Sequence, residues 1–197
     1  MQVSNSCLDI IFRKARTQNA WQNAHVPDGT LEAIYDLMKW GPTSFNSNPV
    51  RIVFCASPDS KKKLADCARE GNQAKIIAAP ITAIIAFDTQ YYELMPKLFP
   101  LEQVEQIIKM YKETEGLAEV TAFRNSSLQG AYFIIATRAL GLDCGPISGF
   151  SNDMVDQVFF SGTTIKSNFI CSIGYGDPRG VWSRLPRPGF QDICRIE

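Results

Sequence analysis

The sequence predicts one domain of the α+β class, in which helices pack on a central sheet. Its 197 residues suit a single domain over residues 1–197. Helix-like and strand-like segments alternate along the chain, and no internal repeat or low-complexity linker separates them. The hydrophobic fraction of 45% is ordinary for a globular protein. A chain of this length buries roughly 70% of the surface of its unfolded form, so its core needs no metal or disulfide.

In the first half of the chain, apolar spacing and helix-end signals define two helices and two strands. One helix starts at Asp28 and ends at Gly41, with its apolar side chains on one face. Residues 51–56 form a β-branched run that predicts a strand, and residues 57–68 open with Ser-Pro-Asp and predict a helix. The apolar run 81–87 predicts a strand that is buried on both faces.

The second half predicts three more helices and a strand. Residues 102–115 form a charged amphipathic helix. Residues 121–140 are apolar around most of the helix circumference, so we expect this helix in the core or, less often, in a subunit interface. Gly141 ends it, residues 153–160 form a short helix, and residues 168–174 form a strand.

Charge and histidine content exclude several classes of function. The 20 basic and 20 acidic side chains balance, whereas a dedicated nucleic-acid binder usually carries a basic excess. The single histidine, His25, lies in a predicted loop, has no evident carboxylate partner, and cannot form a histidine metal cage. We therefore expect no metal site and no nucleic-acid partner.

The six cysteines predict buried or incidental free thiols. None of them forms a CxxC pair, which argues against zinc ribbons and thioredoxin-type redox motifs; they are Cys7, Cys55, Cys67, Cys144, Cys171 and Cys194. The N-terminal residues lack the pattern of a signal peptide, and no stretch approaches the roughly 20 apolar residues that span a bilayer. We expect a soluble, cytoplasmic protein without membrane contact.

Familiar catalytic motifs are missing from the sequence. The pair Gly174 and Gly176 follows a predicted strand, but no third glycine or helix with a later acidic residue follows, so a turn is the better interpretation. No GxxxxGK[ST] loop and no GxSxG elbow occurs. The chain therefore shows no side-chain set for nucleotide hydrolysis or for a serine hydrolase.

Polar segments at predicted element boundaries point to a bound cofactor instead. There are five of them, at residues 16–19, 41–49, 71–75, 145–150 and 183–187. An arginine beside a hydroxyl suits a phosphate, and amides such as those of Asn46 and Asn72 suit the edge of a flat heterocycle. The combination indicates a mononucleotide cofactor that carries the chemistry itself.

These segments also carry a resemblance to a known family. The order RTxN, PTSxNxxP, NxxK, GLDxGPxSGF and SRLP resembles the flavin-dependent nitroreductases, and the resemblance covers about residues 10 to 195. The stretches MKWGPTS, TAFRNSSLQ, RALGLDCGP and IGYGD are more similar to the malonic semialdehyde reductases of bacterial pyrimidine degradation. The resemblance implies a nitroreductase-like fold with a mostly antiparallel sheet, an intertwined homodimer, and FMN bound between the subunits.

The resemblance also implies which residues bind FMN. Arg16 and Arg184 would hold the phosphate with Thr17 beside them, and Asn72 and Lys75 would address the flavin ring and ribityl chain. The remaining positions are Asn19 near the pyrimidine ring, the segment Pro146, Ile147, Ser148 and Gly149 against the flavin, and Pro42, Thr43, Ser44 and Asn46 from the partner subunit.

Three positions depart from the pattern of the relatives. Asn19 stands where many relatives have a base, Ser148 where they have an acid, and Trp182 where some have a lysine. A cation near the ring stabilises reduced flavin, so the change at position 19 bears on the flavin potential, and Lys75 could supply the charge instead.

The activity implied is ping-pong reduction of malonic semialdehyde to 3-hydroxypropanoate, with hydride transfer from NADH or NADPH through flavin N5. Arg124 or Arg187 could meet the substrate carboxylate. The enzymatic alternative is a broad nitroreductase or quinone reductase, and the non-enzymatic alternative is a flavin-binding scaffold without turnover. No motif chooses between NADH and NADPH.

Overall fold

The apolar run Ile81–Asp88 forms strand β2 in the interior of a four-stranded sheet of order β1-β2-β4-β3. The computed structural model describes residues 2–197. The other strands are β1 (Val50–Cys55), β3 (Asp143–Ile147) and β4 (Ile165–Gly174), and every neighbouring pair is antiparallel. The α+β class and the antiparallel sheet are therefore confirmed.

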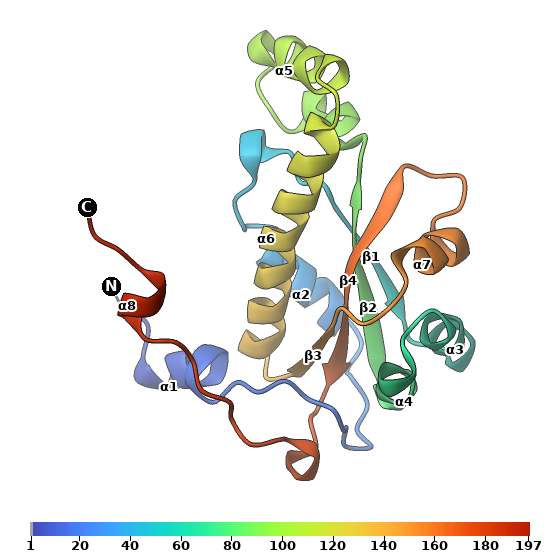
Figure 1. Ribbon diagram of the computed structural model, residues 1–197, viewed down its shortest axis with the longest axis vertical. Helices are drawn as coiled ribbons and strands as arrows, with labels where there is room; N and C mark the ends of the chain where they lie inside the picture. Colours follow the sequence, from blue (N-terminus) through green and yellow to red (C-terminus); the bar gives the residue numbers. More distant parts are fainter. Residues whose placement is uncertain (1) are drawn as a thin grey trace.

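Helices cover both faces of this sheet because β2 alternates its apolar side chains between them (Figure 1). Ala83 and Ile85 pack toward α2 (Thr30–Met38) and α6 (Leu117–Ala139). Ile84 and Ala86 pack on the other side, toward the helices α3 (Pro58–Asp66), α4 (Glu70–Ala78) and α7 (Asn152–Phe159). Strand β2 is thus buried on both faces, as predicted.

A third apolar cluster extends the molecule beyond one end of the sheet. It joins Phe87 and Ala122 to the 3-10 helix η3 (Tyr91–Lys97) and to α5 (Leu101–Glu113). The remaining short elements are α1 (Asn5–Leu8), the π-turn η1 (Asp9–Arg13), η2 (Ser44–Asn46), η4 (Pro178–Gly180) and α8 (Phe190–Ile193). Figure 1 shows the two terminal segments side by side, beyond the sheet.

Helix α6 has a buried face that is rich in polar side chains, and several of its apolar side chains are exposed. Its buried residues include Asn125, Ser126 and Gln129, which face the sheet and neighbouring loops. Large apolar side chains remain exposed outside this buried face, at Val120, Phe123, Leu128 and Tyr132. The helix therefore forms part of the core with one face and leaves an unpartnered apolar face in the single chain.

Some element boundaries differ from the predictions. Helix α6 begins four residues earlier than predicted, after Gly116 at φ 70°, and it ends before Gly141 at φ 84°. The residue that caps α2 is Gly29, at φ 77°, and not Asp28. Residues 71–75 lie inside helix α4, and residues 145–147 lie inside strand β3, whereas the sequence placed both segments at element boundaries.

The cysteines agree with the interpretation of the sequence as free thiols. All six cysteines are free, and those at positions 55, 67, 144 and 171 are buried. No cluster of side chains in residues 2–197 could hold a metal ion. None of the described helices is long and apolar enough to cross a membrane.

Candidate functional site

A cavity of about 750 Å³ opens where the two terminal segments meet the sheet edge. Its walls come from five parts of the chain: Ile11 and residues 15–19, Asn72 and Lys75 of α4, Ile134 and Arg138 of α6, residues 144–149 of β3 and the turn after it, and residues 182–185 and Arg187 of the C-terminal segment. A volume of this size is typical of small-molecule and cofactor sites.

The segment that carries Arg16 lies directly against the edge strand β3. Thr17 forms a parallel bridge with Cys144, and the Gln18 amide donates to the Cys144 carbonyl at 2.9 Å. The close approach requires a glycine at position 145, because a Cβ there would stand 2.6 Å from the Gln18 carbonyl oxygen. Backbone pairing thus fixes the N-terminal wall of the cavity.

Helix α4 forms a second wall through side chains three residues apart, Asn72 and Lys75. The Asn72 Nδ2 atom donates to the Gly149 carbonyl at 3.0 Å, and the Arg69 amide donates to the same carbonyl at 2.9 Å. The amide N–H of Gly149 has no acceptor among residues 2–197. A free, half-buried backbone donor therefore lines the cavity and can receive an acceptor atom of a ligand.

The third wall is the C-terminal segment, which is tied to the N-terminal segment by two arginines. Arg16 donates to the Trp182 carbonyl, and Arg184 donates to the carbonyls of Arg13 and Ala15 at 2.9 and 3.1 Å. The Lys75 ammonium lies 5.3 Å from the centre of the Trp182 ring. The cationic groups of the cavity therefore converge from elements far apart in the sequence.

The charge of this cavity is positive. Among its described lining residues there is no carboxylate, while the cationic ones are Arg16, Lys75, Arg138, Arg184 and Arg187. Arg138 alone is neutralised, by an ion pair with Asp143 behind the wall. A cleft lined by one sign of charge concentrates ions of the opposite sign, so the site suits an anionic ligand.

Thiol chemistry is not suggested by this site. Cys144 lines the cavity, and its hydrogen bond, together with burial, raises the pKa of the neighbouring Cys171 thiol. Burial raises the pKa of Cys55 to about 11. The Cys171 and Cys55 thiols therefore stay protonated at neutral pH, and a protonated thiol is a poor nucleophile.

The model of the nitroreductase family matches residues 13–176, which include most of these walls. The chain belongs to the nitroreductase family. A protein of Cupriavidus pinatubonensis with the provisional name NADH dehydrogenase/NAD(P)H nitroreductase is 49% identical over 193 residues, covering 98% of each chain. A Ralstonia pickettii protein with the same provisional name, HadB, is 50% identical over 189 residues, covering 96% of each.

A solved structure shares the fold of this chain. It is a protein of Exiguobacterium sibiricum with the provisional name nitroreductase, in complex with FMN, with a TM-score of 0.87, 21% identity, and coverage of 100% of this chain and 99% of the other. The nitroreductase-like fold that the sequence motifs imply is therefore confirmed.

Most of the predicted site residues lie together in the cavity. They are Arg16, Thr17, Asn19, Asn72, Lys75, Pro146, Ile147, Ser148, Gly149 and Arg184. Arg187 also lines it, whereas Arg124 does not. His25 lies outside, on the surface, where its Nε2 atom is 3.6 Å from Asp28.

The other predicted residues, Pro42, Thr43, Ser44 and Asn46, do not line the cavity of this chain. They belong to the loop 42–49, which touches α6 and lies before β1. Within it, Phe45, Asn46 and Asn48 have φ of 52°, 50° and 43°. Such left-handed residues cost roughly 1–3 kcal/mol each and persist only where the surroundings hold them.

Sequence reasoning missed five lining residues, which are Ile11, Ala15, Ile134, Arg138 and Cys144. Ile134 and Arg138 are four residues apart on α6 and so share a helix face, but nothing in the sequence says which face meets a cavity. Ile11 and Cys144 are apolar residues in runs that look like core.

Proposed function

We propose that this nitroreductase binds FMN in the cavity and catalyses the reduction of a small acceptor by NADH or NADPH. The observation that carries the proposal is the cavity lining, which joins unpaired cations to the free Gly149 amide and contains no carboxylate among the described residues. The family membership and the names of the relatives support the same activity.

The residues present suit the parts of FMN. Arg16 and Arg184 would hold the phosphate, because each guanidinium can donate to two oxygens, and Thr17 would add a hydroxyl. Asn72, Lys75 and Asn19 would meet the polar edge of the ring, and Pro146, Ile147, Ser148 and Gly149 would lie along it. Bound FMN would supply the hydride chemistry for which the cavity lining offers no histidine or carboxylate.

Lys75 is the cation that would stabilise negative charge on the reduced ring. Asn19 is neutral and Ser148 carries no acid, so neither can set the charge near the ring. The Lys75 ammonium reaches the cavity from α4 and contacts no carboxylate among the described residues. Its charge is therefore available to a ligand.

The active form would be a homodimer with FMN at the subunit interface. The large apolar side chains exposed on α6 and α2 support this, because packing against a second copy would remove them from water. On α2 the exposed side chains are Tyr35 and Leu37, with Trp40 just beyond its end. Pro42, Thr43, Ser44 and Asn46 lie outside their own cavity, which fits a contribution to the FMN site of a partner.

The physiological acceptor in this proposal is malonic semialdehyde, whose carbonyl takes up a hydride and a proton to give 3-hydroxypropanoate. Arg187 supports an acceptor with a carboxylate, because its guanidinium lines the cavity and donates only to the Leu185 and Pro186 carbonyls. The alternative acceptors are nitroaromatics or quinones, which the names of the relatives favour. Buried free cysteines support a reducing, cytoplasmic location.

The experiment is reconstitution followed by an acceptor screen. Purified protein incubated with FMN and freed of excess ligand should be yellow, and anaerobic NADH or NADPH should bleach it. A flavin that binds but is not bleached would indicate a scaffold without turnover. Comparison of kcat/KM for malonic semialdehyde and for a nitrofuran then decides between the two enzymatic candidates.

A further inference from the structure

Two buried polar side chains on α6, Asn125 and Gln129, have partners in the loop 42–49 and at the start of β1, and not in the cavity. They are 1% and 2% exposed, and they lie four residues apart on one face of the helix. Buried polar groups are costly unless they are hydrogen-bonded. Their partners therefore indicate what these residues do.

Asn125 holds the first part of the loop 42–49. Its Oδ1 atom accepts from the Ser44 amide at 2.8 Å, and its Nδ2 atom donates to the Ser44 hydroxyl at 3.3 Å. The same Nδ2 atom donates to the Thr121 carbonyl at 2.8 Å, which fixes the orientation of the amide. Both the backbone and the side chain of Ser44 are therefore hydrogen-bonded to helix α6.

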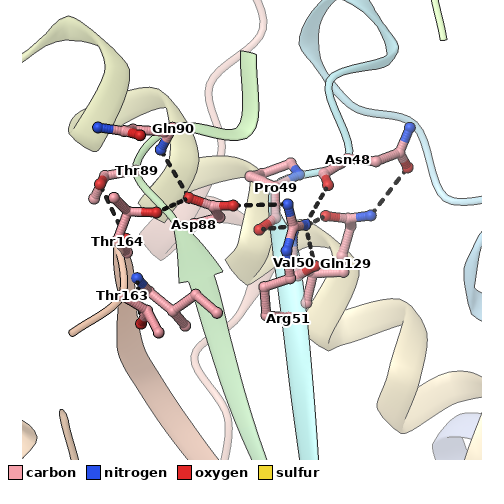
Figure 2. A network of polar contacts seen from close by, with 11 residues as sticks. Asn48, Pro49, Val50, Arg51, Asp88, Thr89, Gln90, Gln129, Thr163 and Thr164 are labelled. Carbon is pink, nitrogen blue, oxygen red and sulfur yellow. Dashed lines mark hydrogen bonds and ion pairs between the residues drawn. The ribbon is translucent and has the colours of Figure 1, made fainter. Parts of the chain in front are cut away.

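Gln129 holds the other end, one helical turn further along (Figure 2). Its Oε1 atom accepts from the Val50 amide at 3.0 Å, and its Nε2 atom donates to Asn48 Oδ1 at 3.1 Å. Asn48 in turn donates to the Asn46 carbonyl at 2.7 Å. Figure 2 also shows Arg51, just after Val50, paired with Asp88 at 2.8 Å, so this end is anchored to β2 as well.

Between these two anchors the backbone is left-handed at Phe45, Asn46 and Asn48. A loop that merely connects α2 to β1 has no need of this conformation, since a relaxed backbone would serve equally well. We propose that Asn125 and Gln129 are positioning residues, which hold this loop in the conformation that completes the FMN site of a second copy of this chain. The inference rests on the proposed function, because FMN is the ligand of that site.

The helix itself separates the loop from the cavity of its own chain. Asn125 contacts the loop, and Arg138 lines the cavity 13 residues later, a spacing of about 20 Å along the axis. A two-fold axis across the exposed apolar face of α6 would bring the loop end of one copy to the cavity end of the other. The loop would therefore act in trans.

The first test compares Asn125→Ala and Gln129→Ala with Ser126→Ala as a matched control. Ser126 is fully buried on the same helix, but its hydroxyl accepts from Asn168 and does not touch the loop. We expect each of the first two variants to weaken FMN binding roughly tenfold. Ser126→Ala should bind FMN as the wild type does, even where its melting temperature falls by as much.

A second variant avoids the core. Asn48→Gly removes the acceptor of Gln129 and lets the backbone relax without a cavity in α6. It should weaken FMN binding by a similar factor, with a fall in melting temperature no larger than that of Ser126→Ala. Unchanged FMN affinity in Asn48→Gly, or equal weakening in Ser126→Ala, overturns the positioning role.

Mixed dimers test the action in trans. A dimer of one Arg184→Ala subunit and one Asn125→Ala subunit, isolated through two affinity tags, keeps one intact site if the loop serves its partner. It should then bind one FMN with wild-type affinity, measured by quenching of flavin fluorescence. No FMN bound with wild-type affinity means that the loop acts within its own chain and overturns the inference. A wild-type protein that binds no FMN overturns the proposed function first.

Discussion

The close packing of the turn that follows β3 predicts that the substitution Gly149→Ala lowers both the stability of the fold and the affinity for FMN. The backbone accepts alanine, because φ at this position is not in the left-handed region, but a Cβ would stand 2.4 Å from Asn72 Nδ2. That separation is about 1 Å shorter than an ordinary contact of 3.4 Å. The Asn72 amide must therefore swing away from its acceptor, the Gly149 carbonyl.

The magnitude follows from the hydrogen bond that is lost. The bond from Asn72 to Gly149 is 3.0 Å long, and such a bond contributes about 1 kcal/mol to stability. The displaced Asn72 side chain would also no longer meet the flavin ring, which weakens FMN binding by about 1.4 kcal/mol, or tenfold. Urea unfolding of the apoprotein measures the first effect, and titration of flavin fluorescence measures the second.

Helix α4 offers a matched control in Gly71→Ala. A Cβ at position 71 meets no atom within 4 Å, so alanine should leave FMN binding unchanged and stabilise the helix by up to about 1 kcal/mol. If Gly149→Ala matches the wild type in both stability and FMN affinity, the contact between the β3 turn and α4 does not shape the site. The reasoning would then be refuted.

Three further predictions concern the phosphate end, the core and acid stability. Arg184→Ala should weaken FMN binding by about 1.5–3 kcal/mol, the loss expected for charged hydrogen bonds to phosphate, and an unchanged dissociation constant would contradict the assignment. Gly130→Ala should destabilise the fold by about 1–3 kcal/mol in urea unfolding, because its Cβ would overlap Phe169 at 2.5 Å, and an unchanged midpoint would disprove this. Hydrogen bonds from Arg179 lower the pKa of Asp177 from 3.8 to about 2. The contribution of this carboxylate is therefore present above pH 3.8 and is lost as the pH falls toward 2, so Asp177→Asn should flatten the acid-unfolding profile in that window.

The sequence predicted well those elements whose apolar pattern matches the burial of their side chains in the fold. Strand β2 is apolar throughout and is buried on both faces, and α3 begins at the Ser57 cap, whose hydroxyl accepts from the Ser60 amide at 3.1 Å. Strand β3 was missed because Gly145 and Pro146 are poor strand residues. They are tolerated because β3 is the last strand of the sheet, where a proline needs no partner on its open side.

In helix α4 the local sequence preference disagrees with the observed structure. Gly71 and Asn72 disfavour a helix, but burial of Ile76 against the sheet outweighs that local preference. The polar segments of the cavity were recognisable in the sequence, but their convergence on one site was predictable only through the resemblance of their motifs to a known family. Arg16, Lys75 and Arg184 come together because the N-terminal segment pairs with β3 and the C-terminal segment is hydrogen-bonded to the N-terminal one. No local sequence pattern encodes these contacts. The hydrogen bonds of Asn125 and Gln129 likewise join residues about 80 positions apart, at separations of 81 and 79.

The measurement that tests the account most directly is the FMN content of the purified, reconstituted protein. The account predicts a yellow protein with one FMN per chain, whose visible absorption disappears when NADH or NADPH is added without oxygen. A protein that stays colourless after incubation with FMN would contradict the account at its centre, because the cationic cavity would then serve another ligand.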